Sequence, residues 1–304
     1  MQTVIITFIT LVAFAANSVL CRWALLDQTI DPLSFSIVRI LSGVLTLLIL
    51  LTLPSNAKRK QDKAVNNTPM YSKVRSQFDL TAIVALLVYM FGFSFAYLTL
   101  GAGLGALVLF VAVQFTMIAA HLLAGNRMSL LEWCGCLLSV SGLIYLLMPT
   151  DSKSSPDITS IILMALAGIG WGIYTLAGKK STNALQSTTA NFGFSSLALF
   201  VLLSLLAVIP SVALQISITE QGLIYAVLSG SVASGIGYSL WYNVVKKLNT
   251  VIASIAQLSV PVIATLGGVL LLSEPVTMQF IISSTVILLG ISLVLFAPKL
   301  EKRS

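Results

Sequence analysis

Polar residues that lie inside long apolar stretches are the residues of this chain that are best placed to do chemistry. Arg39 lies six residues after Leu33, where the second apolar stretch begins. A buried guanidinium can bind a carboxylate or a phosphate through two parallel hydrogen bonds. The alternative is structural, because a long cationic side chain can also reach water or a backbone carbonyl. Arg39 is therefore a candidate substrate-binding residue.

Three amides lie at comparable depths in other apolar stretches. Gln114 and Gln257 are near the middles of the fourth and ninth stretches, and Asn17 is in the first. An amide can orient a polar solute without carrying a permanent charge. An interhelical hydrogen bond is the structural alternative for each of them. We interpret all three as candidate substrate-binding residues.

Aromatic residues within the apolar stretches could supply a wall for an apolar or aromatic solute. Trp171, Tyr174 and Tyr238 are the candidates, and ordinary helix packing is the alternative. Trp241 and Tyr242 lie close to two lysines, so we expect them in the belt of aromatic residues at the membrane–water interface.

Groups that could support enzymatic or ion-coupled chemistry are sparse. His121 is the single histidine, and either a proton relay or a structural role fits it. No carboxylate lies at mid-depth in an apolar stretch, which argues against strict proton antiport and against an intramembrane enzyme. Without a phosphate-binding loop of the Walker type or a cluster of metal ligands, we expect no cofactor.

Composition indicates that the elements carrying these residues are membrane helices. Charged residues make up 9% of the 304 residues, hydrophobic residues make up 57%, and mean hydropathy is +0.99. A soluble domain carries about 25% charge, and a helix needs about 20 apolar residues to cross a bilayer. We therefore predict an all-α integral membrane protein in a lipid bilayer. Its ten spans are residues 3–25, 33–53, 79–100, 104–124, 130–148, 158–178, 188–209, 222–245, 251–272 and 278–296.

The distribution of basic residues predicts the orientation of these spans. Of the 17 lysines and arginines, all but Arg22, Arg39 and Lys153 fall on one side when ten spans alternate. Because cytoplasmic loops collect lysine and arginine, both termini should be cytoplasmic. The same rule accounts for the net charge of +7, and we expect no nucleic-acid partner.

Runs of small residues and one proline predict special helix geometry. Residues 101–105 and 229–235 are rich in glycine, alanine and serine, which allow helices to approach closely or to bend. Pro261 should free a backbone carbonyl and kink the ninth span.

The two halves of the chain resemble each other. Gly142 and Gly290 occupy similar places in the fifth and tenth spans and are 148 positions apart. Because each half has five spans, an odd number, the second half begins on the opposite side of the membrane. We therefore predict two inverted five-helix repeats, residues 1–150 and 151–304, an architecture that suits alternating access.

The ends of the two repeats resemble those of EamA proteins in the drug/metabolite transporter superfamily. The resemblance rests on the sequence from Gly125 through Ser129, Glu132 and Gly135 to Gly142, and on Pro261 followed by residues 270–277. It covers nearly the whole chain, with one departure, because Asn126 stands where the family usually has Glu, which the second repeat keeps at Glu274. The resemblance implies ten helices, inverted symmetry and a central solute cavity. Members of the EamA family often export amino acids or related metabolites.

These observations lead to one functional prediction and two alternatives. We expect a secondary transporter in a bacterial-type inner membrane that exports amino acids or related small metabolites by alternating access. It would be a monomer or a weak homodimer. An intramembrane enzyme, or a receptor or scaffold without transport, remains the alternative, and solute flux would separate these classes.

Overall fold

The computed structural model describes residues 2–53, 70–125, 127–148, 157–207, 216–248 and 256–300, and these are almost entirely helical. The helices are α1 (Gln2–Leu26), α2 (Pro32–Thr52), α3 (Met70–Arg75), α4 (Leu80–Ala96), α5 (Ala102–Leu123), α6 (Leu130–Leu147), α7 (Ile158–Lys180), α8 (Ala184–Ala207), α9 (Glu220–Leu228), the π-helix η1 (Ser229–Ile236), α10 (Gly237–Val245), α12 (Ser259–Leu272) and α13 (Met278–Leu300). Within the described ranges, extended pairing is limited to an isolated antiparallel bridge between Ile30 and Ile218.

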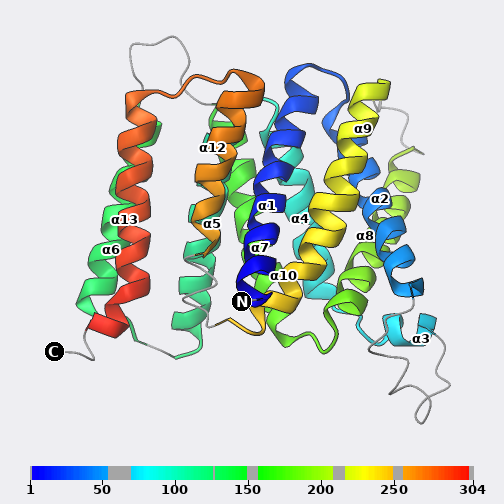
Figure 1. Ribbon diagram of the computed structural model, residues 1–304, viewed down its shortest axis with the longest axis horizontal. Helices are drawn as coiled ribbons and strands as arrows, with labels where there is room; N and C mark the ends of the chain where they lie inside the picture. Colours follow the sequence, from blue (N-terminus) through cyan, green and yellow to red (C-terminus); the bar gives the residue numbers. More distant parts are fainter. Residues whose placement is uncertain are drawn as a thin grey trace.

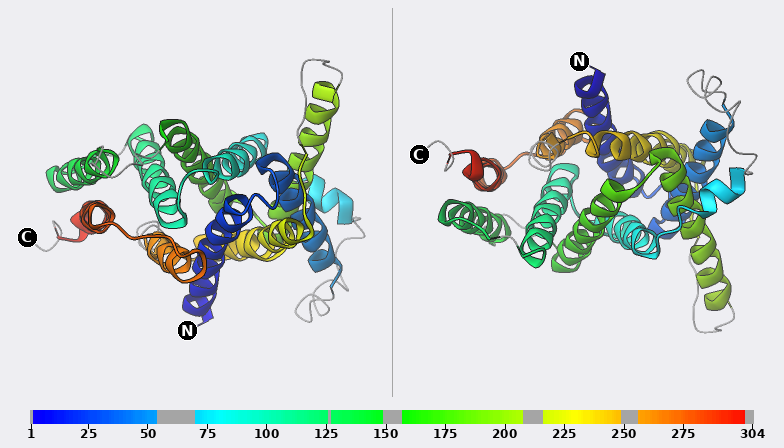
Figure 2. Two further views of the ribbon diagram at one scale, coloured as in Figure 1. Left: turned by 90° about the horizontal axis from the view of Figure 1, so that it is seen from above. Right: turned by 90° about the horizontal axis from the view of Figure 1, so that it is seen from below.

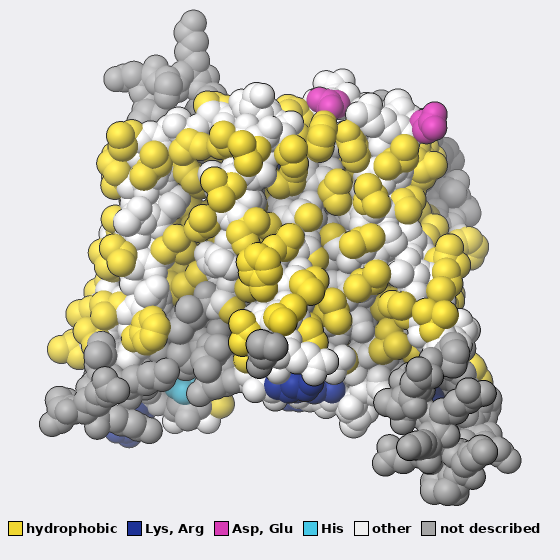
Figure 3. Space-filling view, in the orientation of Figure 1, with side chains coloured by type: hydrophobic (Ala, Val, Ile, Leu, Met, Phe, Trp, Pro, Cys, Tyr) yellow, Lys and Arg dark blue, Asp and Glu magenta, His cyan; other side chains and the backbone are white. Residues whose placement is uncertain are grey.

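The helices support the prediction of an all-α membrane protein. Across the described ranges, six helical runs are long and apolar enough to cross a bilayer, namely α1, α2, α5, α7, α8 and the continuous run from α9 through η1 to α10. Shorter apolar helices, α4, α6, α12 and α13, occupy the other four predicted spans. Large apolar side chains cover the face drawn in Figure 3, as expected of a surface that meets lipid. Ten crossings therefore remain a prediction, built from six long helices and four shorter ones.

The long helices run side by side (Figure 1), and on the face drawn in Figure 3 the Asp and Glu side chains lie at one end and the Lys and Arg side chains at the other. On α7 the separation is direct, because Asp157 precedes the helix and Lys179 and Lys180 lie in its last turn. We call the end with Lys179 and Lys180 the basic end, and the opposite one the acidic end. Helix α1 begins and helix α13 ends at the basic end (Figure 1).

Short polar side chains start the helices at both ends of the molecule. Asp31, Asp79 and Asp157 each accept a hydrogen bond from a backbone N–H in the first turn of the helix that follows. Ser129 and Glu132 form a reciprocal capping box at the start of α6. Such caps satisfy N–H groups that have no partner within the helix.

Small residues bring helices together, as their runs predicted. A Cβ on Gly230 of η1 would clash with the backbone oxygen of Arg39 on α2. At one edge of the molecule α6 and α13 lie side by side (Figure 2), and the Ser139 hydroxyl donates to the Ile287 carbonyl over 3.3 Å. Close backbone approach of this kind is a common way for membrane helices to associate.

Two predictions change once the helices are packed. Trp241 and Tyr242 are not interface residues, because α10 packs into the bundle and leaves them 0% and 1% exposed. Near Pro261 the chain makes a turn at Leu258 and α12 begins at Ser259, so the proline lies in the first turn of that helix. Asn126, Lys153 and residues 54–69, 149–156 and 249–255 lie outside the described residues.

Candidate solute-binding site

Arg39 is the centre of a buried polar network. It follows the Asp31 cap and Pro32 by about 10 Å along α2, and it is 0% exposed. Its Nε donates to Ser234 Oγ over 2.9 Å. Its Nη2 donates to the hydroxyls of Tyr89 over 2.9 Å and Tyr238 over 2.6 Å. Three helices, α2, α4 and α10, and the π-helix η1 therefore meet at this guanidinium.

The positive charge of Arg39 is surrounded by neutral groups. Its hydrogen-bond partners are hydroxyls, and its Nη1 atom is buried without a hydrogen-bond partner. The guanidinium also lies over the rings of Tyr89 and Phe93, 5.1 Å and 4.9 Å from their centroids. Burying a charge without an opposite charge is costly, so such a residue in a membrane helix marks a candidate site.

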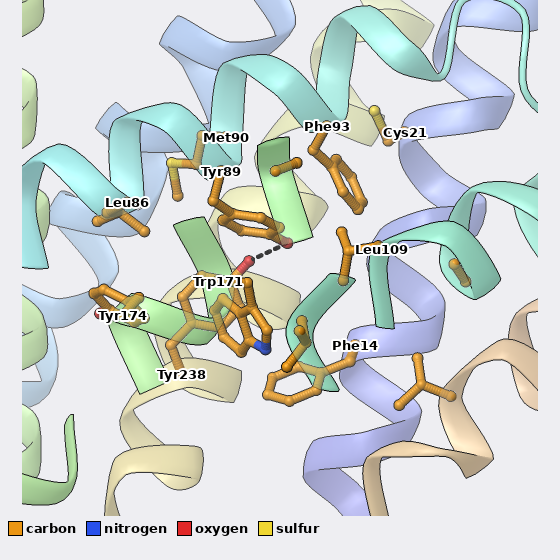
Figure 4. Close-up of a cluster of buried hydrophobic side chains, with 14 of the residues drawn as sticks. Phe14, Cys21, Leu86, Tyr89, Met90, Phe93, Leu109, Trp171, Tyr174 and Tyr238 are labelled. Carbon is orange, nitrogen blue, oxygen red and sulfur yellow. Dashed lines mark hydrogen bonds between the residues drawn. The ribbon is translucent and has the colours of Figure 1, made fainter. Parts of the chain in front are cut away.

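Asn17 of α1 belongs to the same network. Its Nδ2 donates to the Tyr89 hydroxyl over 3.1 Å, and its Oδ1 accepts from Ser229 Oγ over 2.6 Å. The Tyr238 hydroxyl donates to the Tyr89 hydroxyl over 2.8 Å (Figure 4). We call Asn17, Arg39, Tyr89, Ser229, Ser234 and Tyr238 the Arg39 network.

Aromatic rings form a wall beside this network (Figure 4). The Trp171 ring lies 4.7 Å from that of Tyr238 and 5.0 Å from that of Tyr89. Its indole Nε1 donates to Gln257 Oε1 over 3.2 Å, and its ring lies 5.6 Å from that of Tyr174. The Arg39 guanidinium could therefore bind an anion beside this aromatic wall. The Gln257 amide lies at the edge of the wall, next to the Trp171 indole.

The structure brings six of the seven predicted site residues into this one cluster. Gln114 is buried on α5, and the contacts above do not extend to it. The sequence analysis did not identify Tyr89, Ser229, Ser234 or Phe93, nor Phe14, whose ring lies 5.1 Å from that of Trp171. Tyr89 carried the same signal as Tyr238, a tyrosine within an apolar stretch, and could have been found. The serines carried no such signal, because hydroxyls in helices usually bond to their own backbone.

Two cavities lie at the two ends of the bundle, and Arg39 lines neither of them. The acidic-end cavity, about 540 Å³, contains the ion pair of Arg22 Nε with Glu274 Oε1, 3.1 Å apart. The other Glu274 oxygen accepts from the N–H of Ala102 over 2.8 Å, at the start of α5. The basic-end cavity, about 210 Å³, lies among α4, α7, α8 and α10.

Comparisons with known proteins agree with this architecture. The model of the EamA-like transporter family matches the chain twice, over residues 1–148 and 158–296. An uncharacterized protein of Pseudomonas aeruginosa is 41% identical over 301 residues, covering 99% of this chain and 96% of that relative. An uncharacterized transporter of Clostridium kluyveri is 22% identical over 94% of this chain and 90% of its own length.

Similarity to a solved structure concerns the fold alone. A chain described only as the crystal structure of a protein superimposes with a TM-score of 0.57, covering 97% of each chain at 19% identity.

An uncharacterized transporter of Archaeoglobus fulgidus is 25% identical in sequence over 71% of this chain and 78% of its own length.

Proposed function

The chain belongs to the EamA-like transporter family and is a multi-pass membrane transporter, and we propose that it exports amino acids or related small metabolites. In this proposal it is a secondary carrier of a bacterial-type inner membrane. The observation that carries the proposal is the buried Arg39, whose partners are all neutral.

A substrate carboxylate would offset the free-energy cost of burying the Arg39 charge without an opposite charge. It would supply the missing negative charge and accept from the unpartnered Nη1 atom. The described residues of the Arg39 network include no carboxylate that could hold a bare cation. Anions and zwitterions therefore fit the site better than amines do.

The aromatic wall supports a solute with an apolar body. The rings of Trp171, Tyr174 and Tyr238 pack together next to the Arg39 network, and Gln257 Oε1 accepts a hydrogen bond from the Trp171 indole. A side chain packed there would leave water while its carboxylate stays paired. Amino acids with apolar or aromatic side chains combine both features.

Alternating access between two inverted repeats would move such a solute across the membrane. The separate family matches to the two halves support the repeat. The contact of Ser139 with Ile287 also supports it. These residues are 148 positions apart, as are Gly142 and Gly290, so they occupy equivalent places in the two halves. Residues of both halves contribute to the site, so rocking of one half against the other would change access to it.

The orientation in the membrane follows from the charge separation. With ten crossings, the basic end would face the cytoplasm and hold both termini. The lysines in the last turn of α7 and the aspartate before it support this orientation.

Counterflow in proteoliposomes tests the proposed function. Vesicles with the purified protein are loaded with unlabelled amino acids, and uptake of labelled ones is followed with and without a pH gradient. We expect saturable counterflow that does not depend on the gradient and that weakens in Arg39→Ala and Gln257→Ala. Gln221→Ala, which changes an exposed glutamine on α9, is the matched control. Absence of saturable counterflow for every amino acid would contradict amino acids as substrates.

A further inference from the structure

The basic-end cavity is joined to the Arg39 network by a series of contacts between tyrosine rings. Asn191 of α8 and Tyr242 of α10 line it, together with Ser181 and Lys180 at the end of α7. Lys180 is exposed, so its ammonium group faces solvent near the cavity. The carboxylate of Asp79, which also lines the cavity, is engaged by the N–H of Ala82.

A pair of tyrosines separates this cavity from Arg39. The rings of Tyr242 and Tyr174 lie 4.9 Å apart, and the Tyr242 hydroxyl donates to the Tyr174 carbonyl over 3.0 Å. Behind this pair, the Tyr174 ring lies 6.2 Å from that of Tyr238, which binds Arg39 directly. We call Tyr174 and Tyr242 the tyrosine barrier.

Several of the buried polar atoms without hydrogen-bond partners belong to residues of the cavity, the tyrosine barrier and the Arg39 network. Ser181 Oγ and Asn191 Oδ1 belong to residues that line the cavity, Tyr174 Oη belongs to the barrier, and Arg39 Nη1 belongs to the network. Buried polar groups almost always have a partner in a folded protein. These atoms would gain hydrogen-bond partners if water or a solute reached them in another state of the carrier.

We propose that the basic-end cavity is the port through which a carboxylate-bearing solute reaches Arg39, and that the tyrosine barrier closes this port in the present conformation. The inference rests on the proposed function and adds the route to it. Lys180 attracts the anion at the mouth, and the anion passes Asn191, which lines the cavity, before the barrier opens. The acidic-end cavity is less suited to an anion, because its cation, Arg22, is already paired with Glu274.

Thiol labelling in sealed vesicles of known orientation tests the route. In a chain with Cys21→Ala, Cys134→Ala and Cys136→Ala, single cysteines replace Asn191 or Ser187, both in the basic-end cavity. The probe is an anionic methanethiosulfonate, and the protecting solute is phenylalanine. Thr99→Cys, in the acidic-end cavity, is the matched control. Each variant is first checked for phenylalanine counterflow.

We expect Asn191→Cys and Ser187→Cys to react from the basic side and Thr99→Cys from the acidic side. Phenylalanine at ten times its dissociation constant should slow labelling of Asn191→Cys about tenfold, because about nine-tenths of the sites are then occupied. It should leave Thr99→Cys unchanged. Tyr174→Phe, which removes only an unpartnered hydroxyl, should slow counterflow without lowering the unfolding temperature.

Labelling of Asn191→Cys and Ser187→Cys only from the acidic side would overturn the inference. The inference would also be overturned if phenylalanine did not slow labelling of Asn191→Cys while counterflow of phenylalanine persisted. In that case the proposed function would still stand. Absence of phenylalanine counterflow in the parent chain would contradict this choice of substrate and the inference with it.

Discussion

The Nη2 atom of Arg39 lies 2.6 Å from the hydroxyl of Tyr238, a residue 199 positions away in the other half of the chain. The contact joins the two halves at a buried charge whose hydrogen-bond partners among the described residues are hydroxyls. A carrier that rocks about this point would have to break or remake the contact. Binding of an anion at Arg39 and movement of the halves are therefore coupled in our account.

The tyrosine hydroxyls that bind Arg39 should matter more than a tyrosine hydroxyl near the surface. Tyr89→Phe and Tyr238→Phe each remove a hydrogen bond to a charged group, worth about 1.5–3 kcal/mol. We expect a lower unfolding temperature in detergent and an altered half-saturating concentration in counterflow. Tyr225→Phe, whose hydroxyl accepts from Gln221, is the control and should change neither quantity. Equal behaviour of the three variants would argue against a special role for the network.

Gly230 should not tolerate a larger side chain. A Cβ there would clash with the Arg39 carbonyl and the Ser42 hydroxyl, so Gly230→Ala must push η1 away from α2. We expect a loss of about 1–3 kcal/mol in stability, as for other overpacked sites, together with loss of counterflow. Gly193→Ala on α8 meets no atom within 4 Å and should be neutral or stabilising. A comparison of unfolding temperatures checks this, and equal temperatures would contradict the close packing.

Glu274 should hold the acidic end closed. It pairs with Arg22 and caps the first turn of α5 through Ala102. Glu274→Gln removes the charge from both contacts, and we expect about 1–3 kcal/mol of destabilisation. Labelling of Thr99→Cys from the acidic side should also become faster. Glu220→Gln, an exposed glutamate in the first turn of α9, is the control. Unchanged labelling in Glu274→Gln would show that the pair does not restrict this end.

Acid should weaken the contact between the loop before α2 and the loop before α9, where the Asp31 carboxylate accepts a hydrogen bond from the Ser217 N–H. Partial burial acts to raise the pKa of Asp31, but hydrogen bonds from Ser34 and from the Ser217 N–H outweigh it and hold the pKa below its usual value. The folded protein thus favours the ionised form. The resulting stability is present above about pH 4 and is lost as the pH falls through the lowered pKa.

Unfolding temperatures of the parent chain and of Asp31→Asn between pH 7 and pH 3 measure this effect. We expect Asp31→Asn to be less stable at pH 7 and the difference to shrink below about pH 4. Asp27→Asn, on the same loop, is the control. A difference that grows on acidification would have the wrong sign for a lowered pKa.

Much of the architecture was predictable because the membrane makes polar residues conspicuous. Arg39, Asn17 and Gln257 stood out as polar side chains in apolar stretches, and the structure places each of them in one cluster. The partners were harder to predict, since packing of distant helices decides which hydroxyl meets a guanidinium. Ser234 reaches Arg39 from a π-helix, a form that composition does not specify.

One error shows how local sequence can mislead. Trp241 and Tyr242 precede Lys246 and Lys247, a pattern typical of the interface belt. Instead the Tyr242 ring packs against Tyr174, and Phe14 packs against Trp241, so both residues are buried. The lysines do lie at the basic end, and only the direction of the aromatic side chains was wrong.

The most direct test of the central claim compares phenylalanine with phenylalaninamide, which lacks the carboxylate, in counterflow by the parent chain and by Arg39→Gln. We predict that the parent chain moves phenylalanine and discriminates against the amide. Loss of about 3 kcal/mol of charge-assisted hydrogen bonding in Arg39→Gln corresponds to about a 100-fold loss of phenylalanine counterflow and should remove the discrimination. Equal counterflow of both compounds by the parent chain, or unchanged discrimination in folded Arg39→Gln, would contradict the assignment of Arg39 as the carboxylate receptor.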